Sequence, residues 1–211
     1  MRVPYADGTV VKAPSGIDEK ALLLMADIFP TGFFGASNAF KNMTREQISN
    51  AIVVVIGCGP VGLCAIIAAC SFAPKHVFAV DSVDSRLELA KSLGAEPLNF
   101  MTDREGMEKR VKEMTGGRGA DAVIEVVGLS PALKTGFDLL RPWGTLSSIG
   151  VHNAEVSRPR LLYAHEAHTR IRFHGLATKR TVRTSLYRWG DAPSAPYSLK
   201  RWHSSRRSSI Y

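Results

Sequence analysis

Short apolar runs alternate with amphipathic segments along residues 51–151. The runs of strand length are Ile52–Ile56, His76–Val80, Ala120–Val127 and Gly144–Val151, with a weaker one at Glu96–Phe100. The segments between them with helical spacing are Asp84–Leu93, Glu105–Met114 and Pro131–Leu140. Strands that alternate with helices of about ten residues are typical of a parallel sheet with right-handed crossovers. The pattern predicts an α/β fold with a doubly wound parallel sheet.

Residues 1–50 do not follow this alternation. Val3–Pro14, with Asp7-Gly8 near its middle, predicts a short hairpin. The following apolar run, Leu22–Gly32, contains one carboxylate, Asp27. A buried acid is costly unless it is paired, protonated or bound to a metal, so Asp27 is a candidate metal ligand. The structural alternative is a helix or turn cap.

A glycine motif follows the first predicted strand, Gly57-Cys58-Gly59-Pro60-Val61-Gly62. Gly57 permits a tight turn, Gly59 lets the backbone approach a pyrophosphate, and Gly62 lets a helix pack on the strand. The helix that begins here points backbone N–H groups at the phosphates. An ordinary glycine turn is the alternative, but strand, helix, strand and acid occur in the order of a Rossmann dinucleotide site. We therefore predict that Gly57, Gly59, Pro60, Val61 and Gly62 bind a pyrophosphate.

The second predicted strand leads into Asp81, about twenty residues past the motif, where ribose recognition is expected. A carboxylate there accepts hydrogen bonds from ribose hydroxyls and repels a 2′-phosphate, which favours NAD over NADP. Arg86 either lies over the adenosine or is a solvated helix charge. Ligands of such sheets lie beyond the carboxyl ends of the strands. The nicotinamide contacts predicted at that edge are Val127, Gly128, Gly150 and Val151.

The composition of the chain narrows the class of protein to which this site belongs. The chain has 211 residues, 45% of them hydrophobic, and no apolar run reaches the length of a membrane span. The first residues lack the apolar core of a signal peptide, so a cytoplasmic protein without membrane contact is expected. Cys58, Cys64 and Cys70 have neither zinc-lobe nor disulfide-framework spacing, and are interpreted as small buried apolar residues.

The charge of +8 is concentrated near the end of the chain. Residues 1–155 carry 15 Lys and Arg against 17 Asp and Glu, whereas residues 156–211 carry 12 against 2. A basic arm for nucleic acid is one interpretation. It lacks aromatic platforms, so binding by charge alone and no specific nucleic-acid partner are expected. The pair His165 and His168 in the same segment has metal-ligand spacing, but little else there supports a metal site.

Residues 1–155 resemble the zinc-type, medium-chain alcohol dehydrogenase family, most closely its formaldehyde-dehydrogenase-like branch. The matching segments are Ala26–Gly32, Gly57–Gly62, Asp81 with Arg86, Ala90–Ala95, Gly116–Asp121 and Glu125–Gly128. The resemblance implies a homo-oligomeric oxidoreductase in which zinc activates a small alcohol and a hydride passes between that alcohol, or its aldehyde, and NAD. It also implies that Asp27 is a zinc ligand.

The chain departs from that family at both ends. The first two zinc ligands and the structural zinc lobe are expected upstream of Met1, and one carboxylate cannot hold a catalytic zinc. We therefore expect residues 1–50 to be a remnant of the β-rich catalytic domain and residues 51–155 to be the NAD-binding domain. Such a chain should bind NAD without holding zinc or being active alone.

Residues 156–211 form the third predicted unit, a disordered basic tail. Codons able to encode Phe173–Lys179, shifted by one nucleotide, give the family motif IPWTGNE, and Tyr187–Ser194 similarly give LQMGRCPV. Val156-Ser157 and Arg172 can be encoded by splice-donor and splice-acceptor sequences. A retained intron followed by out-of-frame sequence is the resulting hypothesis. It predicts that the sheet loses its sixth strand and that the fifth becomes an exposed edge.

Two other functions compete with this interpretation. One is a zinc-free quinone reductase of the medium-chain type, against which Asp81 argues because many such enzymes use NADPH. The other is a non-enzymatic NAD-binding protein with a genuine basic arm. Cofactor preference and the salt dependence of binding would separate the three.

Overall fold

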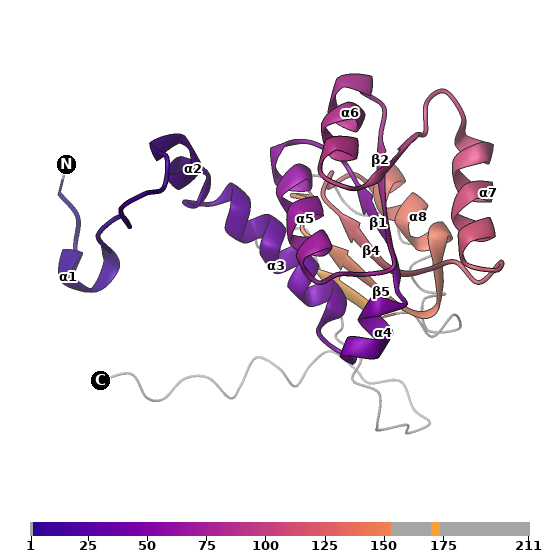
Figure 1. Cartoon of the computed structure of the whole chain (residues 1–211), viewed down its shortest axis with the longest axis horizontal. Coiled ribbons are helices and arrows are strands. Elements are labelled where there is room, and N and C mark those ends of the chain that lie inside the picture. The colour runs from indigo at the N-terminus through magenta and orange to yellow at the C-terminus, as the bar shows by residue number, and fades with distance from the viewer. Residues whose placement is uncertain (1, 153–169, 174–211) are drawn as a thin grey trace, which may run out of the picture.

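A six-stranded parallel sheet forms the centre of the protein (Figure 1). The computed structural model describes residues 2–152 and, as backbone, 170–173. The strand order is β3-β2-β1-β4-β5-β6, in which the order reverses between β1 and β4. The strands are β1 Ile52–Ile56, β2 His76–Asp81, β3 Glu96–Asn99, β4 Ala120–Glu125, β5 Leu140–Ser148 and β6 Arg170–Phe173. This is the predicted doubly wound α/β fold.

Helices cover both faces of the sheet (Figure 1). Helices α3, α5 and α6 contribute to the hydrophobic cluster on one face, and α7 and α8 to the cluster on the other. The helices are α1 Ala6–Thr9, α2 Glu19–Leu24, α3 Ile28–Phe40, α4 Arg45–Ser49, α5 Pro60–Ser71, α6 Asp84–Ser92, α7 Arg104–Met114 and α8 Ser130–Leu139. None in the described part is long and apolar enough to cross a membrane.

The central strand β1 is buried on both sides, as its continuous β-branched run predicts. Val53 and Val55 belong to the cluster beneath α3 and α5, whereas Ile52, Val54 and Ile56 belong to the cluster beneath α7 and α8. Each of these side chains is at most 3% exposed. A strand in this position holds the turn that follows it at the carboxyl edge of the sheet.

The predicted hairpin at Val3–Pro14 is wrong. This segment contains the one-turn helix α1, in which the Tyr5 carbonyl accepts hydrogen bonds from the N–H groups of Gly8 and Thr9. An isolated two-stranded hairpin is marginal without an apolar surface to cover. Residues 2–20 are exposed throughout, so nothing in the described structure supplies such a surface.

Helix α3 extends the packed unit upstream of residue 51. Its residues Ala36, Ala39 and Phe40 are at most 3% exposed and share a cluster with α5. Residues 2–50 therefore hold helices, one of them in the core, and no strand. The assignment of residues 1–50 to a catalytic-domain remnant stays a prediction.

The prediction that β5 is the exposed edge is also wrong, because β6 pairs with it in parallel. The register places Thr145 opposite Arg170 and Ser148 opposite Phe173. Strand pairing uses backbone N–H and C=O groups, which any segment without proline can offer whatever its side chains. The rest of the predicted tail, including His165 and His168, lies outside the described residues.

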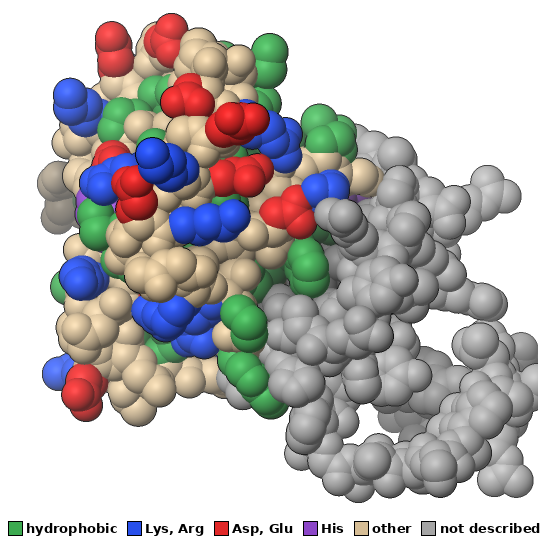
Figure 2. Space-filling view, turned by 90° about the vertical axis from the view of Figure 1, so that its right-hand side faces the viewer, with side chains coloured by type: hydrophobic (Ala, Val, Ile, Leu, Met, Phe, Trp, Pro, Cys, Tyr) green, Lys and Arg blue, Asp and Glu red, His purple; other side chains and the backbone are tan. Residues whose placement is uncertain are grey.

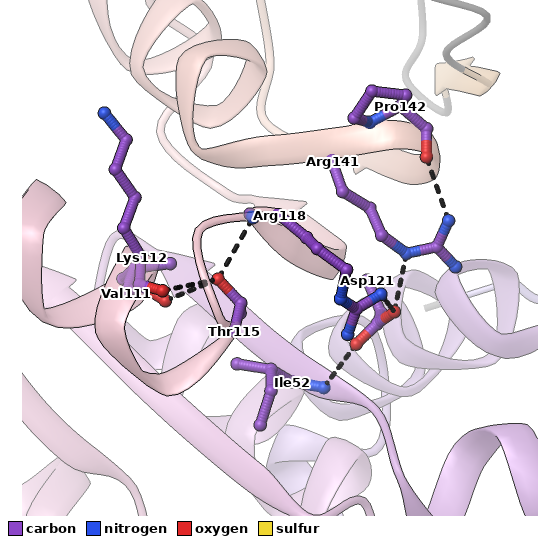
Figure 3. Close-up of polar contacts among 9 residues, drawn as sticks. Ile52, Val111, Lys112, Thr115, Arg118, Asp121, Arg141 and Pro142 are labelled. Atoms are coloured by element: carbon purple, nitrogen blue, oxygen red, sulfur yellow. Dashed lines mark hydrogen bonds and ion pairs between the residues drawn. The ribbon is translucent and has the colours of Figure 1, made fainter.

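At the amino edge of the sheet, one carboxylate joins three strands (Figure 3). Asp121 on β4 accepts a 2.9 Å hydrogen bond from the Ile52 N–H of β1 and a 2.6 Å bond from Arg141 Nε of β5. Arg118 lies 3.8 Å from the same carboxylate. Asp121 is 8% exposed, so this paired charge fixes the register of the three central strands.

The surface over α7 and α8 carries charges of both signs (Figure 2). Pairs four residues apart, Arg104 with Glu108, Lys109 with Glu113 and Lys134 with Asp138, account for part of this pattern. Interspersed charges are typical of a solvated helix face. This face is therefore of mixed charge and not uniformly basic among its described residues.

Candidate cofactor site

A cavity of about 500 Å³ lies beyond the carboxyl ends of β1, β2 and β4. It is at the point where the strand order reverses, which is where open α/β sheets bind ligands. Of the predicted cofactor residues, those that line it are Gly57, Gly59, Pro60, Val61, Gly62, Asp81, Arg86 and Val127. The sequence motif and the cavity therefore coincide.

The glycine turn brings the start of α5 against the end of β1. Gly57 has φ 93°, and its N–H donates to the Val80 carbonyl at 2.8 Å. A Cβ atom at Gly62 would lie 1.8 Å from the Gly57 carbonyl oxygen, so only glycine permits this packing. Gly59 caps α5 without a side-chain hydrogen bond, and Pro60 opens the helix. The first turn of α5 thus presents backbone N–H groups, with the positive end of its dipole, to the cavity.

Asp81 joins this turn to the next one. Its Oδ2 accepts from the Cys58 N–H at 2.7 Å, and its Oδ1 accepts from the N–H groups of Ser82 at 2.7 Å and Val83 at 2.9 Å. Arg86 Nη1 lies 3.8 Å from Oδ2. With three backbone donors, the carboxylate is fixed in place and keeps acceptor capacity toward the cavity.

Cys58 is a buried cysteine beside this site. Burial, and then the neighbouring Asp81 carboxylate, raise the pKa of its thiol to about 12. A thiol with such a pKa stays protonated near neutral pH, and the thiolate is the nucleophilic form. Burial also raises the pKa of Cys64 and Cys70. The interpretation of these cysteines as small apolar residues agrees with their buried or half-buried positions.

The opposite wall of the cavity contains residues that the sequence analysis missed. Arg104, at the start of α7, donates from Nη2 to Thr135 Oγ1 of α8 at 3.2 Å. Thr135 Oγ1 in turn donates to the Pro131 carbonyl at 3.0 Å. The apolar members of this wall are Phe100, Leu129, Pro131 and Ala132. The one sequence signal for Arg104 is its place just after the third strand, at the same edge of the sheet.

The other predicted nicotinamide contacts lie beside the cavity, at the ends of β4 and β5. A Cβ atom at Gly128 would lie 2.3 Å from the Val151 carbonyl oxygen, and one at Gly150 would lie 2.1 Å from the Gly128 nitrogen. The two strand ends are therefore in backbone contact. The fully buried Glu125 carboxylate holds them, since it accepts from the Gly128 N–H at 2.7 Å and from Ser148 Oγ at 2.6 Å.

Asp27 occupies the N-cap position of α3. The expectation that it is buried is wrong, because the residue is exposed. Its Oδ1 accepts a 2.9 Å hydrogen bond from the Thr31 hydroxyl, and its carbonyl accepts from the Thr31 N–H. No three His, Cys, Asp or Glu side chains in the described ranges cluster to hold a metal ion. Asp27 thus stands at the cap position of α3, but its carboxylate makes no capping hydrogen bond to a backbone N–H of the helix, and its role as a metal ligand stays a prediction.

Comparisons with known proteins agree with this geometry. The sequence model of the family described as zinc-binding dehydrogenase matches residues 60–188. The zinc-type alcohol dehydrogenase B of Aspergillus flavus is 74% identical over 156 residues, which is 74% of this chain and 36% of that protein. The medium chain reductase/dehydrogenase ucsI of an Acremonium species is 58% identical over 154 residues, covering 73% of this chain and 53% of that protein.

Solved structures of alcohol dehydrogenases are also similar to this chain. The zinc dependent alcohol dehydrogenase 2 of Streptococcus pneumonia aligns with TM-score 0.71 and 30% identity over 85% of this chain and 49% of that one. The alcohol dehydrogenase TADH of Thermus sp. ATN1 aligns with TM-score 0.67 and 30% identity over 78% of this chain and 45% of that one. The chain thus spans between about a third and about half of these relatives. The family match continues past residue 155, where the predicted domain boundary stays a prediction.

Proposed function

The chain belongs to the zinc-binding dehydrogenase family, and from that membership we propose that its cavity binds NAD as the cofactor part of an oxidoreductase. In the whole enzyme, the bound NAD would accept a hydride from a small alcohol or, when reduced, return one to an aldehyde. The observation that carries the proposal is the pairing of Asp81 with the Gly57–Gly62 turn on one cavity wall.

The pyrophosphate would lie against the start of α5. Gly59 has no heavy atom within 4 Å of the position of a Cβ, so the backbone is bare toward the cavity. Unpaired N–H groups and the helix dipole favour an anion at this point. Gly57, Gly59, Pro60, Val61 and Gly62 are the residues we assign to this contact.

The adenosine ribose would lie at Asp81. The carboxylate is negative and only 6% exposed, and it offers its remaining acceptor capacity to the ribose hydroxyls. A 2′-phosphate would meet this charge at close range, which supports NAD rather than NADP. Arg86, 51% exposed and 3.8 Å from the carboxylate, would cover the ribose or the adenine from the solvent side.

The adenine would lie between the apolar wall and Arg104. Phe100, Leu129 and Ala132 supply surface for a planar base, and the guanidinium of Arg104 offers stacking and hydrogen bonding. The bond from Arg104 to Thr135 holds that guanidinium at the cavity wall. The nicotinamide would then extend toward Val127, Gly128, Gly150 and Val151.

The described residues do not fit a catalytic zinc. Such a site needs three protein ligands, and Asp27 belongs to no group of three His, Cys, Asp or Glu side chains in the described ranges. We derive no catalytic step through zinc in this chain. We propose instead that it binds NAD and relies on parts of the whole enzyme for any metal-dependent chemistry.

Three further features of the whole enzyme belong to this proposal. They are a small alcohol or aldehyde as substrate, assembly as a homo-oligomer and a cytoplasmic location. The relatives named alcohol dehydrogenases support the substrate class. Homo-oligomer assembly and the cytoplasmic location are what the family resemblance and the sequence imply, and no helix in the described part of the chain could span a membrane.

Calorimetric titration of the full chain with NAD and with NADP tests the proposal. Saturable NAD binding, at least about tenfold tighter than NADP binding, is the expected result, since a ribose-facing carboxylate disfavours a 2′-phosphate. Equal affinities would contradict the role of Asp81. Binding of neither nucleotide would contradict the function itself.

A further inference from the structure

Glu125 is a buried carboxyl group that the proposed cofactor contacts do not use. It is the last residue of β4, and its side chain is 0% exposed. Its Oε1 accepts from the N–H groups of Val127 at 2.8 Å and Gly128 at 2.7 Å. Its main-chain carbonyl accepts from the N–H groups of Ile149 at 2.9 Å and Gly150 at 3.2 Å. One residue therefore fixes the backbone beyond both β4 and β5.

The second carboxylate oxygen begins a chain of side chains. Oε2 lies 2.6 Å from Ser148 Oγ, and Ser148 Oγ lies 3.0 Å from His152 Nε2. A serine hydroxyl has one proton, and Ser148 Oγ donates it to Glu125 Oε2. Ser148 Oγ therefore accepts from a proton on His152 Nε2. His152 Nε2 is itself 3.5 Å from Glu125 Oε2, which completes a compact buried triangle.

This triangle lies behind the backbone at the ends of β4 and β5, formed by Gly128, Gly150 and Val151 and called the rim below. The rim has no room to change its packing. Gly128, with φ 77°, Gly150 and Val151 pack so closely that a single added Cβ would overlap backbone atoms. Close-packed backbone transmits displacement instead of absorbing it. The position of the rim is therefore set by the hydrogen bonds that Glu125 makes, together with Ser148 and His152.

The rim continues directly from the cavity. Val127 lines the cavity while its N–H donates to Glu125. A dinucleotide whose adenosine lies at Asp81 and whose pyrophosphate lies at α5 must extend its second half beyond the carboxyl ends of β4 and β5. Backbone groups of the rim are then the protein surface available to the nicotinamide.

We propose that Glu125, Ser148 and His152 are positioning residues that fix this rim against the nicotinamide half of the cofactor. The inference rests on the proposed NAD function. The inference assigns the two halves of the ligand to different parts of the protein. Binding of the adenosine and pyrophosphate relies on the wall of Asp81 and Gly57–Gly62, whereas binding of the nicotinamide relies on the triangle of Glu125, Ser148 and His152.

Binding of ADP-ribose and NADH to the full chain tests this division, because ADP-ribose lacks the nicotinamide. The variants are Glu125→Gln and Ser148→Ala, with affinities from calorimetry and the nicotinamide environment from the fluorescence of bound NADH. Each variant should weaken NADH binding about tenfold, as expected for losing one buried hydrogen bond that holds the contact surface. ADP-ribose affinity should stay within about twofold, since its contacts lie on the other wall.

Ser147→Ala is the matched control. Ser147 is the neighbouring β5 residue, 1% exposed, and its hydroxyl has no hydrogen-bond partner among the described residues. It should leave both ligands unchanged. If Glu125→Gln shows no cooperative melting transition, the result for Ser148→Ala decides the question. That variant keeps all four hydrogen bonds that Glu125 accepts from backbone N–H groups.

The outcomes separate the inference from the function on which it rests. Unchanged NADH binding in Ser148→Ala, or an equal loss of NADH and ADP-ribose affinity, would overturn the positioning role while leaving the cofactor site intact. Failure of the unsubstituted chain to bind ADP-ribose would overturn both.

Discussion

The backbone N–H of Cys58 donates a 2.7 Å hydrogen bond to the carboxylate of Asp81 across 23 residues of sequence. The residue that would face the ribose thus also holds the turn that would face the pyrophosphate. Two recognition tasks depend on one buried carboxylate. A change at Asp81 should therefore alter both the strength and the selectivity of nucleotide binding.

Asp81→Ala is the first prediction. We expect NAD affinity to fall and the preference for NAD over NADP to shrink by about tenfold or more, or ~1.4 kcal/mol, because the charge that repels a 2′-phosphate is gone. Asp84→Ala serves as the control, since Asp84 is exposed on α6 and its carboxylate bonds to Asn99. Calorimetry with both nucleotides measures the ratio. An unchanged ratio would remove Asp81 from cofactor selection.

Gly59→Val should abolish cofactor binding without harming the fold. Gly59 has φ −69° and ψ −176°, which any residue adopts, and nothing lies within 4 Å of a Cβ placed there. The added side chain would occupy the space that the pyrophosphate needs, and we expect affinity to fall by about a hundredfold or more. Thermal melting should match that of Gly8→Val, a glycine with equally open surroundings far along the chain. Unchanged NAD affinity would overturn the placement of the cofactor.

Arg104→Ala should weaken the adenosine half of the site. Loss of a guanidinium that stacks on or bonds to the base should reduce ADP-ribose affinity about three- to tenfold. Lys109→Ala is the control, because Lys109 is on the same helix and pairs with Glu113 instead of lining the cavity. Equal effects of the two substitutions would indicate a general charge effect and no specific contact.

The central strand and the glycine turn could be predicted because their signals are local. Ile52–Ile56 is a continuous β-branched run, and the structure gives β1 these same bounds. The end of β4 could not be predicted from its apolar run to Val127. The Val126 N–H still bonds to the Ile56 carbonyl of β1, but the Glu125 side chain takes the N–H groups of Val127 and Gly128, so the strand does not continue to Val127.

The remaining differences arise from contacts distant in sequence. Arg104 meets Thr135 at a separation of 31 residues, and Ser148 meets Glu125 at a separation of 23, so neither pair leaves a periodic signal. Strand β6 joins the sheet through backbone pairing, which composition does not reveal. The false hairpin at Val3–Pro14 shows the converse, since a turn signal predicts a strand pair only where apolar cover exists.

Asp121→Asn should destabilise the sheet. The amide retains one acceptor but loses the charge that pairs with Arg141 at 2.6 Å in a site that is 8% exposed. We expect a loss of about 2–3 kcal/mol in the free energy of unfolding, measured by urea denaturation. Arg118→Ala should cost less than about 1 kcal/mol, because Arg118 is 58% exposed and 3.8 Å away. A larger effect at Arg118 than at Asp121 would contradict the central role of the carboxylate.

Glu96 should make stability depend on acid pH. Arg110 donates to its carboxylate at 2.6 and 3.0 Å, and these hydrogen bonds are the largest cause lowering the pKa of Glu96 below its usual value of 4.5. A carboxyl whose pKa is lower in the folded than in the unfolded state binds protons more readily when unfolded. Its stabilisation is therefore complete above about pH 5 and is lost as the pH falls through the lowered folded pKa.

Glu96→Gln isolates this contribution. The variant should be less stable than the unsubstituted chain by up to about 1 kcal/mol at pH 7, a modest value because Arg110 and Glu96 are 40% and 28% exposed, so water screens the pair. The difference should shrink as the pH falls below about 4, since protonation then removes the same charge from the unsubstituted chain. Urea denaturation between pH 7 and pH 3 measures both curves, with Glu113→Gln as the control on the exposed Lys109 pair. If the two curves of unfolding free energy against pH stay parallel, Arg110 and Glu96 stabilise the fold by contact and not by charge. Only a contribution from the ionised Glu96 would change as the carboxyl group is protonated.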